Sequence, residues 1–127
     1  MEIELCRCCS GLKYVDCCEP YHQLQADAKT PEALMRSRYC AYALQLADYI
    51  VVTTHPSVRH LHQKDAILAW AKANSWLKLE ICAAQNNIVE FKAYYVHQNS
   101  MHVHHERSTF LIHQQKWFYL EGEYFEV

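Results

Sequence analysis

The chain has 127 residues, of which 51% are hydrophobic and 20% are charged, which is typical of a small globular protein and excludes a disordered one. Its formal net charge of −2 lacks the basic excess of nucleic-acid-binding domains, so we expect no nucleic-acid partner. No apolar stretch approaches the roughly 20 residues of a transmembrane helix, and the first residues lack the basic and apolar regions of a signal peptide. We therefore expect a cytoplasmic location and no membrane partner.

The cysteines are concentrated at the start of the chain, where five of the seven lie: Cys6, Cys8, Cys9, Cys17 and Cys18. Thiols stay reduced in the cytoplasm, so this clustering indicates a metal site rather than disulfides. Zinc prefers four soft ligands in a tetrahedron, which a Cys-x-Cys pair and an adjacent Cys-Cys pair can supply together. We predict one structural zinc ion, because a closed four-thiolate site has no vacant position, with these ligands: Cys6, Cys8, Cys17 and Cys18.

The residues between the two cysteine pairs fit this prediction. Gly11 allows the backbone to double back, and Asp16 is placed to cap a helical turn that begins at the second pair. Four thiolates around a divalent ion leave a charge of about −2, which Arg7 and Lys13 could offset.

Cys9 leaves alternatives open. It could replace Cys8 as a ligand, although Cys8 preserves the Cys-x-Cys spacing. As a spare thiol, Cys9 is either merely tolerated or reactive in a redox or metal-sensing role, which would require a low thiol pKa.

Helices are predicted from about residue 30 to residue 75. Thr30-Pro31-Glu32 predicts a helix start, because threonine caps exposed amides, proline suits the first position and glutamate complements the dipole. Aromatic and apolar residues then recur along one helical face: Met35, Tyr39, Tyr42, Leu46 and Tyr49. A second short helix follows, although residues 50–54 are β-branched, because Asp48 can cap it and His55-Pro56 would end it.

A third helix is predicted over about 63–74, with one side formed by Ile67, Trp70, Ala71 and Asn74. Four strands follow from about residue 76, since apolar and polar residues alternate there with a period of two, at Leu77, Leu79 and Ile81 and again at Val89, Phe91, Ala93 and Tyr95. Asn86-Asn87 predicts a tight hairpin between the first two strands. The third covers about 102–113, with Phe110 and Ile112 inward, and the fourth 117–126. Helices followed by an antiparallel sheet define an α+β fold.

The segment from Cys6 to Cys18 resembles the SEC-C motif, the zinc-binding tail of the SecA translocation ATPase and of many other bacterial proteins, in its Cys-x-Cys-x-Ser-Gly, tyrosine-containing spacer and Cys-Cys. Longer stretches resemble the bacterial YchJ-type proteins: residues 17–21, 34–42, 54–57, 106–110 and 117–122. The resemblance implies a nuclear-transport-factor-2-like (NTF2-like) cone of three helices packed in a curved sheet, and no known reaction. We divide the chain into a SEC-C-type motif at 1–22 and an NTF2-like domain at 23–127.

Five polar residues in the family-like stretches are candidates for a pocket that such a cone can enclose: Arg36, Arg38, His55, Glu106 and Arg107. An arginine at the pocket mouth would bind an anion or carboxylate in a bidentate manner. The alternative is an ion pair of Glu106 with Arg36 or Arg38 that fixes the first helix to the sheet.

His102 and His104 share a strand face with Glu106, and two histidines with a carboxylate can hold a catalytic metal. We prefer to interpret them as an ordinary polar strand face. Five aromatic residues are expected to be mostly core: Tyr39, Tyr42, Trp70, Trp117 and Tyr119.

These features predict a zinc-containing protein that acts without catalysis by binding a protein partner. The alternative is a small-molecule binder or enzyme that uses the pocket of the cone, a hypothesis that rests on analogy with the fold. A homodimer through the open face of the sheet is the expected assembly.

Overall fold

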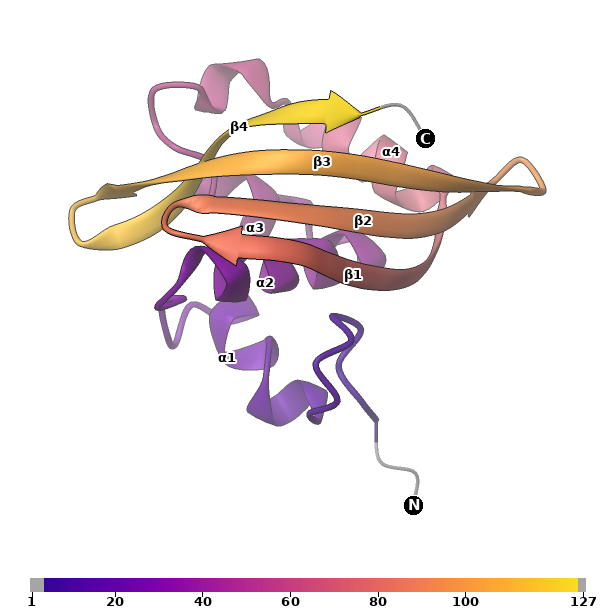
Figure 1. The fold of residues 1–127 in the computed structure, drawn as a ribbon, viewed down its shortest axis with the longest axis horizontal. Helices are drawn as coiled ribbons and strands as arrows, with labels where there is room; N and C mark the ends of the chain where they lie inside the picture. The colour runs from indigo at the N-terminus through magenta and orange to yellow at the C-terminus, as the bar shows by residue number, and fades with distance from the viewer. Residues whose placement is uncertain (1–3, 126–127) are drawn as a thin grey trace.

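The computed structural model describes residues 4–125, in which helices precede strands as predicted (Figure 1). The helices are α1 (Glu19–His22), α2 (Pro31–Ala43), α3 (Ala47–Val52) and α4 (Lys64–Ala73), with short 3-10 turns at Tyr14–Asp16 and Arg59–Leu61. The strands are β1 (Ser75–Gln85), β2 (Ile88–His97), β3 (Ser100–His113) and β4 (Lys116–Phe125). The predicted α+β class is confirmed. Within residues 4–125, none of the helices has the length and apolar character needed to cross a membrane.

The four strands form one antiparallel sheet in the order β1-β2-β3-β4. The predicted hairpin at Asn86-Asn87 is confirmed, with a φ of 56° at Asn86. Gln98-Asn99 and Gln114-Gln115 join the other strands, and all four residues have positive φ values. Positive φ at both central residues gives a turn whose twist matches the flanking strands. Glutamine is not typical of such turns, which is why these two were not predicted.

The start of α2 forms as predicted. The hydroxyl of Thr30 accepts a hydrogen bond from the amide of Ala33 at 3.1 Å, and Pro31 occupies the first helical position. The helix then packs across the sheet, where Leu34 and Met35 are buried in the main core.

The single helical face predicted from Met35 to Tyr49 is in fact divided between α2 and α3. Gln45 has a φ of 63°, which ends α2 and leaves Leu46 as the exposed residue before α3. The second helix is confirmed, but its predicted cap is wrong. Asp48 lies inside the first turn, and its carboxylate pairs with the Lys64 ammonium at 2.9 Å.

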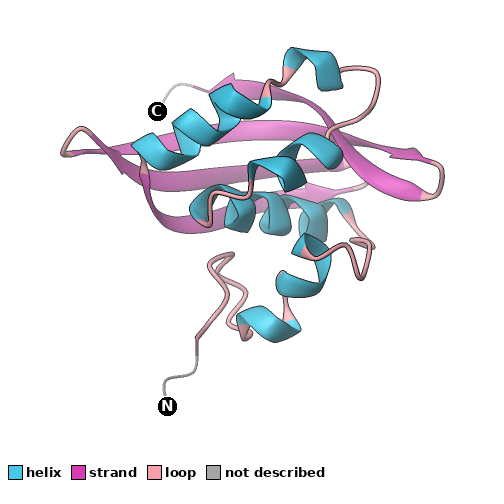
Figure 2. Cartoon of the chain, turned by 180° about the vertical axis from the view of Figure 1, so that it is seen from behind, coloured by secondary structure: helices cyan, strands magenta, loops and turns pink. Residues whose placement is uncertain are grey.

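The helices cover one face of the sheet (Figure 2). Alternate residues of β2 and β3 face them and are buried: Val89, Phe91, Ala93, Glu106, Ser108 and Phe110. Two residues are exposed against expectation: Leu77, which belongs to the predicted apolar alternation, and Ile112, which was predicted to point inward. Leu77 falls at a register shift of β1, which interrupts the alternation. Ile112 lies near the β3–β4 hairpin, which extends past the helices (Figure 1).

Candidate functional site

Four cysteine sulfur atoms meet in the N-terminal segment: those of Cys6, Cys8, Cys17 and Cys18, all within 4.8 Å of one another. The Cys8 and Cys17 sulfurs are 3.6 Å apart, and those of Cys17 and Cys18 are 3.9 Å apart. A tetrahedral ion with metal–sulfur bonds of about 2.3 Å holds its sulfurs about 3.8 Å apart. The four cysteines therefore fit a tetrahedral metal ion.

A tight loop carries the first two cysteines. The Cys6 amide donates to the Leu12 carbonyl at 2.8 Å, and Gly11, with a φ of 86°, lets the backbone return. The second pair follows a 3-10 turn, and Cys18 directly precedes α1. The predicted cap of the turn at the second pair is wrong: Asp16 ends the 3-10 turn, and the residue before α1 is Cys18, with no side-chain capping bond.

The thiols of the cluster interact strongly with one another. The hydrogen bond with Cys18 lowers the pKa of the Cys8 thiol to about 4, whereas burial raises the pKa of Cys6 to about 12. Cys8 and Cys18 are almost completely buried. Neighbouring thiolates repel one another in such a place, so the cluster needs a cation to hold four negative charges.

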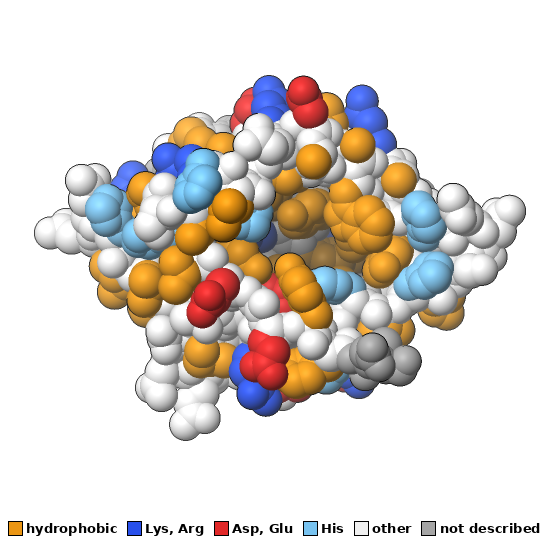
Figure 3. Space-filling view, turned by 90° about the horizontal axis from the view of Figure 1, so that it is seen from above, with side chains coloured by type: hydrophobic (Ala, Val, Ile, Leu, Met, Phe, Trp, Pro, Cys, Tyr) orange, Lys and Arg blue, Asp and Glu red, His pale blue; other side chains and the backbone are white. Residues whose placement is uncertain are grey.

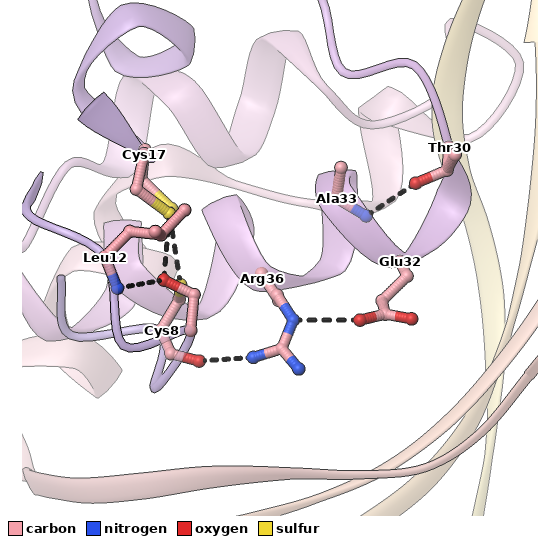
Figure 4. A network of polar contacts seen from close by, with 9 residues as sticks. Cys8, Leu12, Cys17, Thr30, Glu32, Ala33 and Arg36 are labelled. Atoms are coloured by element: carbon pink, nitrogen blue, oxygen red, sulfur yellow. Dashed lines mark hydrogen bonds and ion pairs between the residues drawn. The ribbon is translucent and has the colours of Figure 1, made fainter.

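Arg36 joins the cysteine loop to α2 (Figure 4). Its Nη1 donates to the Cys8 carbonyl at 2.8 Å, and its Nε donates to the Glu32 carboxylate at 3.0 Å. Arg36 therefore places a positive charge beside the cluster, a task that the sequence had suggested for Arg7 and Lys13.

His22 makes a second link between the motif and α2. A carbonyl can only accept, so Nε2 of His22 donates to the Ser37 carbonyl at 2.8 Å, and Nδ1 then accepts from the Tyr14 hydroxyl at 2.7 Å. Burial lowers the pKa of His22 below its ordinary value of 6.5, in agreement with a neutral ring.

Two further cysteines lie near the cluster. The completely buried Cys40, on α2, has its sulfur 3.8 Å from that of Cys6, a neighbour that sequence analysis missed because Cys40 lies outside the motif. Cys9 is exposed, and its sulfur accepts a hydrogen bond from the Leu79 amide of β1 at 3.4 Å. The reactivity of Cys9 stays a prediction.

The second feature is a pocket of about 340 Å³ between α2, α4 and the inner face of the sheet. Viewed from above, the molecule is hollowed at the centre, and hydrophobic side chains rim the hollow (Figure 3). Aromatic residues supply much of the lining, among them Tyr39, Tyr42, Trp70, Trp76, Phe91 and Tyr119. Of the five aromatic residues expected to be mostly core, Tyr39 and Tyr119 are buried in the main core, and Trp117 packs against it. Tyr39 and Tyr119 also line this pocket, as do Tyr42 and Trp70.

Glu106 is the buried carboxylate of this pocket. Its Oε1 accepts from His104 at 2.7 Å, and its Oε2 accepts from the hydroxyls of Ser108 and Tyr119. Burial raises the pKa of Glu106, but these hydrogen bonds outweigh burial and lower it below its ordinary value of 4.5. On β4, any side chain at Gly122 would overlap the carboxylate, so the glycine provides its space.

Arg38 is the buried cation of the pocket. Its Nη1 donates to the Ile50 carbonyl at 3.1 Å and to the Thr53 hydroxyl at 2.7 Å, and its guanidinium lies 4.5 Å from the Tyr119 ring centre. The alternative ion pair of Glu106 with Arg36 or Arg38 is not formed in residues 4–125, because the Glu106 oxygens are occupied by neutral or histidine donors.

Of the five residues expected at the pocket, the structure brings Arg38 and Glu106 together there and places three elsewhere. Arg36 lies at the cysteine cluster. His55 bonds the Ser57 hydroxyl outside the pocket, and Arg107 pairs with Glu90 across the other face of the sheet. Arg36 and Arg38 lie two positions apart on a helix and so point to different faces. The local sequence does not show which of these faces borders the pocket.

The alternative metal site on the histidine strand is not formed in the described part of the chain. His102 stacks on Tyr95, with ring centres 5.4 Å apart, whereas His104 bonds Glu106.

A second possible set of metal ligands lies on the outer face of the sheet: Cys82, Glu90 and His105. Glu90 there also pairs with Arg107 at 3.1 Å, and Cys82 is exposed. The ion pair already occupies the carboxylate, so we assign no site to this group.

Helices on one face of a four-stranded antiparallel sheet, preceded by a four-cysteine motif, define the class of NTF2-like domains that carry a SEC-C motif. The family model described as "YchJ, middle NTF2-like domain" matches residues 30–122. The chain belongs to this YchJ family, whose curated relatives are called UPF0225 proteins.

Curated relatives and solved structures support this family assignment. The UPF0225 protein of Actinobacillus succinogenes is 38% identical over 93% of this chain and 80% of its own, and one from Haemophilus influenzae (strain PittEE) is 41% identical over 93% and 77%. The solution structure of a SEC-C motif containing protein from Rhodopseudomonas palustris has a TM-score of 0.88 and 40% identity, covering 95% of this chain and 98% of that one. The crystal structure of a SEC-C motif containing protein from Psychrobacter arcticus has a TM-score of 0.80 and 33% identity, covering 94% and 81%.

Proposed function

We propose that this chain is a small-molecule-binding protein whose N-terminal segment is held by one structural zinc ion. The pocket carries the proposal, because the cone is not filled by its own side chains. Its volume of about 340 Å³ falls within the roughly 300–1,000 Å³ of ligand sites. Aromatic walls with a few fixed polar groups are the usual lining of such sites.

The zinc proposal rests on the four thiols. Sulfur ligands favour zinc, copper(I) and iron–sulfur clusters, and a single tetrahedral four-thiolate site fits zinc. The proposed ligands, Cys6, Cys8, Cys17 and Cys18, leave no open position for a substrate, so the ion acts structurally. It would fix the conformation of the N-terminal segment, which is joined to α2 by the contacts of Arg36 with Cys8 and of His22 with Ser37.

Binding of a neutral fluorescent probe, N-phenyl-1-naphthylamine, tests the pocket. Ala93 lines the pocket, so Ala93→Phe should fill it and abolish the fluorescence increase that the wild type gives. Ala83→Phe is the matched control, because Ala83 is exposed on β1. Equal probe binding by wild type and Ala93→Phe, or no binding by the wild type, would contradict the proposal.

Binding of a protein partner is a second candidate function, supported by exposed apolar side chains around the cysteine motif: Leu5, Leu12, Val15 and Leu24. Exposed apolar side chains mark an interaction site where they form a contiguous patch, and these four all lie within residues 5–24. A photo-crosslinking residue at position 12 should capture one defined protein in cells, whereas the same residue at the exposed Lys72 of α4 should not. Identical crosslinking patterns at both positions would remove this candidate.

A further inference from the structure

Arg38 is a buried cation with part of its hydrogen-bonding capacity unused. The residue is 4% exposed, and its hydrogen bonds all leave from Nη1, to oxygens of Ile50, Thr53 and Thr54. In residues 4–125, no group accepts from Nε or Nη2, and no carboxylate lies within 4.0 Å of the guanidinium. A charge withdrawn from water without an opposite charge is unfavourable, so this position favours an incoming anion.

The unused donors of Arg38 are not fully buried. The described residues include no fully buried side-chain nitrogen or oxygen without a partner, so Nε and Nη2 remain accessible. Arg38 is one of the residues that line the pocket. Nε and Nη2 form one edge of the planar guanidinium, and this edge matches a carboxylate with two parallel hydrogen bonds.

Glu106, the carboxylate of the pocket, forms no ion pair with Arg38 in residues 4–125. Both oxygens of Glu106 are occupied, Oε1 by His104 and Oε2 by Ser108 and Tyr119. Tyr119 contacts both charges, with its ring under the guanidinium and its hydroxyl on Glu106. Arg38 therefore has no directly paired anion among the described residues, and a bound molecule could supply one.

The side chains that line the pocket indicate which chemical group would accompany the anion in a bound molecule. Trp70 and Trp76 pack edge to face, with ring centres 6.5 Å apart, and Tyr39 packs edge to face on Trp76 at 6.1 Å. All three line the pocket, together with Phe91. Aromatic faces and edges of this kind favour a flat apolar group.

We propose that the pocket binds a small monocarboxylate with a flat apolar body, and that Nε and Nη2 of Arg38 hold its carboxylate. This inference rests on the proposed pocket function and adds the class of ligand. Glu106 lines the same pocket, so a second negative charge on the ligand would be repelled.

Among the described residues that line the pocket, none besides Arg38 supplies a free cation for a multiply charged anion. Burial and the charge of Arg38 lower the pKa of His62 below 6.5, so this imidazole is neutral at pH 7. His104 is held by Glu106 at 2.7 Å. The guanidinium edge matches both carboxylate and phosphate, but one cation beside Glu106 favours a singly charged anion over doubly charged phosphate.

Calorimetric titration of the zinc-loaded full chain tests the class of ligand with three probes: 2-naphthoate, its neutral amide 2-naphthamide, and inorganic phosphate. We expect 2-naphthoate to bind about tenfold more tightly than 2-naphthamide, with no measurable phosphate binding. Arg38→Met should make the two naphthalene affinities equal. Arg107→Met should keep the preference, because Arg107 lies on the other face of the sheet.

Nη1 of Arg38 also anchors α3, so circular dichroism must first show that each variant is folded. Arg38→Lys provides a second variant, since lysine keeps the charge but lacks the planar edge, and should reduce the preference to about threefold. Equal affinities in the wild type, a preference that survives in folded Arg38→Met, or phosphate binding as tight as naphthoate would each overturn the class of ligand alone. Failure of both naphthalene probes to bind would overturn the pocket function itself.

Discussion

The cysteine cluster and the pocket lie on two faces of the same helix and are built in different ways. All four cluster cysteines come from the short segment Cys6–Cys18. The pocket takes its lining from α2, α4 and all four strands. A site made within one short segment can be recognised from residue spacing, whereas a site made by distant segments depends on how the helices cross the sheet.

Helix α2 connects the two regions. Arg36 and Cys40 contact the cluster, whereas Met35, Arg38 and Tyr39 line the pocket. Neighbouring residues of a helix point about 100° apart, so one helix can serve both sites. The cluster side is closed and fully occupied by thiols, while the pocket side has unused donors.

The largest expected effect is the loss of one cluster thiol. Cys8→Ser should cost on the order of 4 kcal/mol of the free energy of unfolding, because losing a structural metal is among the most damaging single changes. Urea unfolding measures this loss. The control is Cys82→Ser, at an exposed position on β1, which should leave the midpoint unchanged. A similar midpoint for Cys8→Ser and wild type would show that the cluster does not stabilise the chain.

On the pocket side, Glu106→Gln should cost about 2 kcal/mol at pH 7, because an amide cannot accept all the hydrogen bonds that the carboxylate accepts. The lowered pKa of Glu106 means that its contribution is complete above the unfolded-state value and is lost as pH falls through the folded-state value. The difference in unfolding free energy between wild type and variant should therefore shrink as the pH falls below 4.5. A difference that stays constant from pH 7 to pH 3 would contradict this account of the carboxylate.

A substitution of Cys40 tests whether the metal site is limited to the four proposed cysteines. We expect Cys40→Ala to keep a full complement of metal and to lose about 1 kcal/mol of stability, since it removes a small buried side chain and no proposed ligand. Metal analysis together with urea unfolding gives both values. Loss of metal in this variant would make Cys40 a ligand and the four-cysteine assignment wrong.

The smallest effect is expected for Arg36, which sequence analysis assigned to the pocket. Arg36→Met should change the affinity for 2-naphthoate by less than about twofold, because its side chain bonds Cys8 and Glu32 on the cluster side. Calorimetric titration of Arg36→Met and Arg38→Met with 2-naphthoate compares the two affinities directly. A loss as large as that of Arg38→Met would show that the two faces of α2 are not separate.

Local chemistry accounts for what was predictable. The Thr30 cap and the Asn86-Asn87 hairpin depend on a few adjacent residues, and both formed as predicted. The break at Gln45 was missed because the aromatic spacing continues across it. The lining of the pocket was missed because burial at helical or strand spacing does not reveal whether a side chain borders a core or a cavity.

Cys40 is a second example of a feature that the local sequence does not reveal. Nothing in the spacing of the motif includes it, and only the packing of α2 against the cysteine loop brings its sulfur to Cys6. Arg36 and Arg38 have the same side chain and lie two residues apart, so only the placement of α2 separates their roles.

The most direct test of the central claim is the zinc content of protein purified without added metal, measured for wild type and for Cys17→Ser. Four thiols at tetrahedral spacing predict one zinc ion per wild-type chain and none in the variant. A wild-type chain without zinc, or zinc that is unaffected by Cys17→Ser, would contradict the structural metal site.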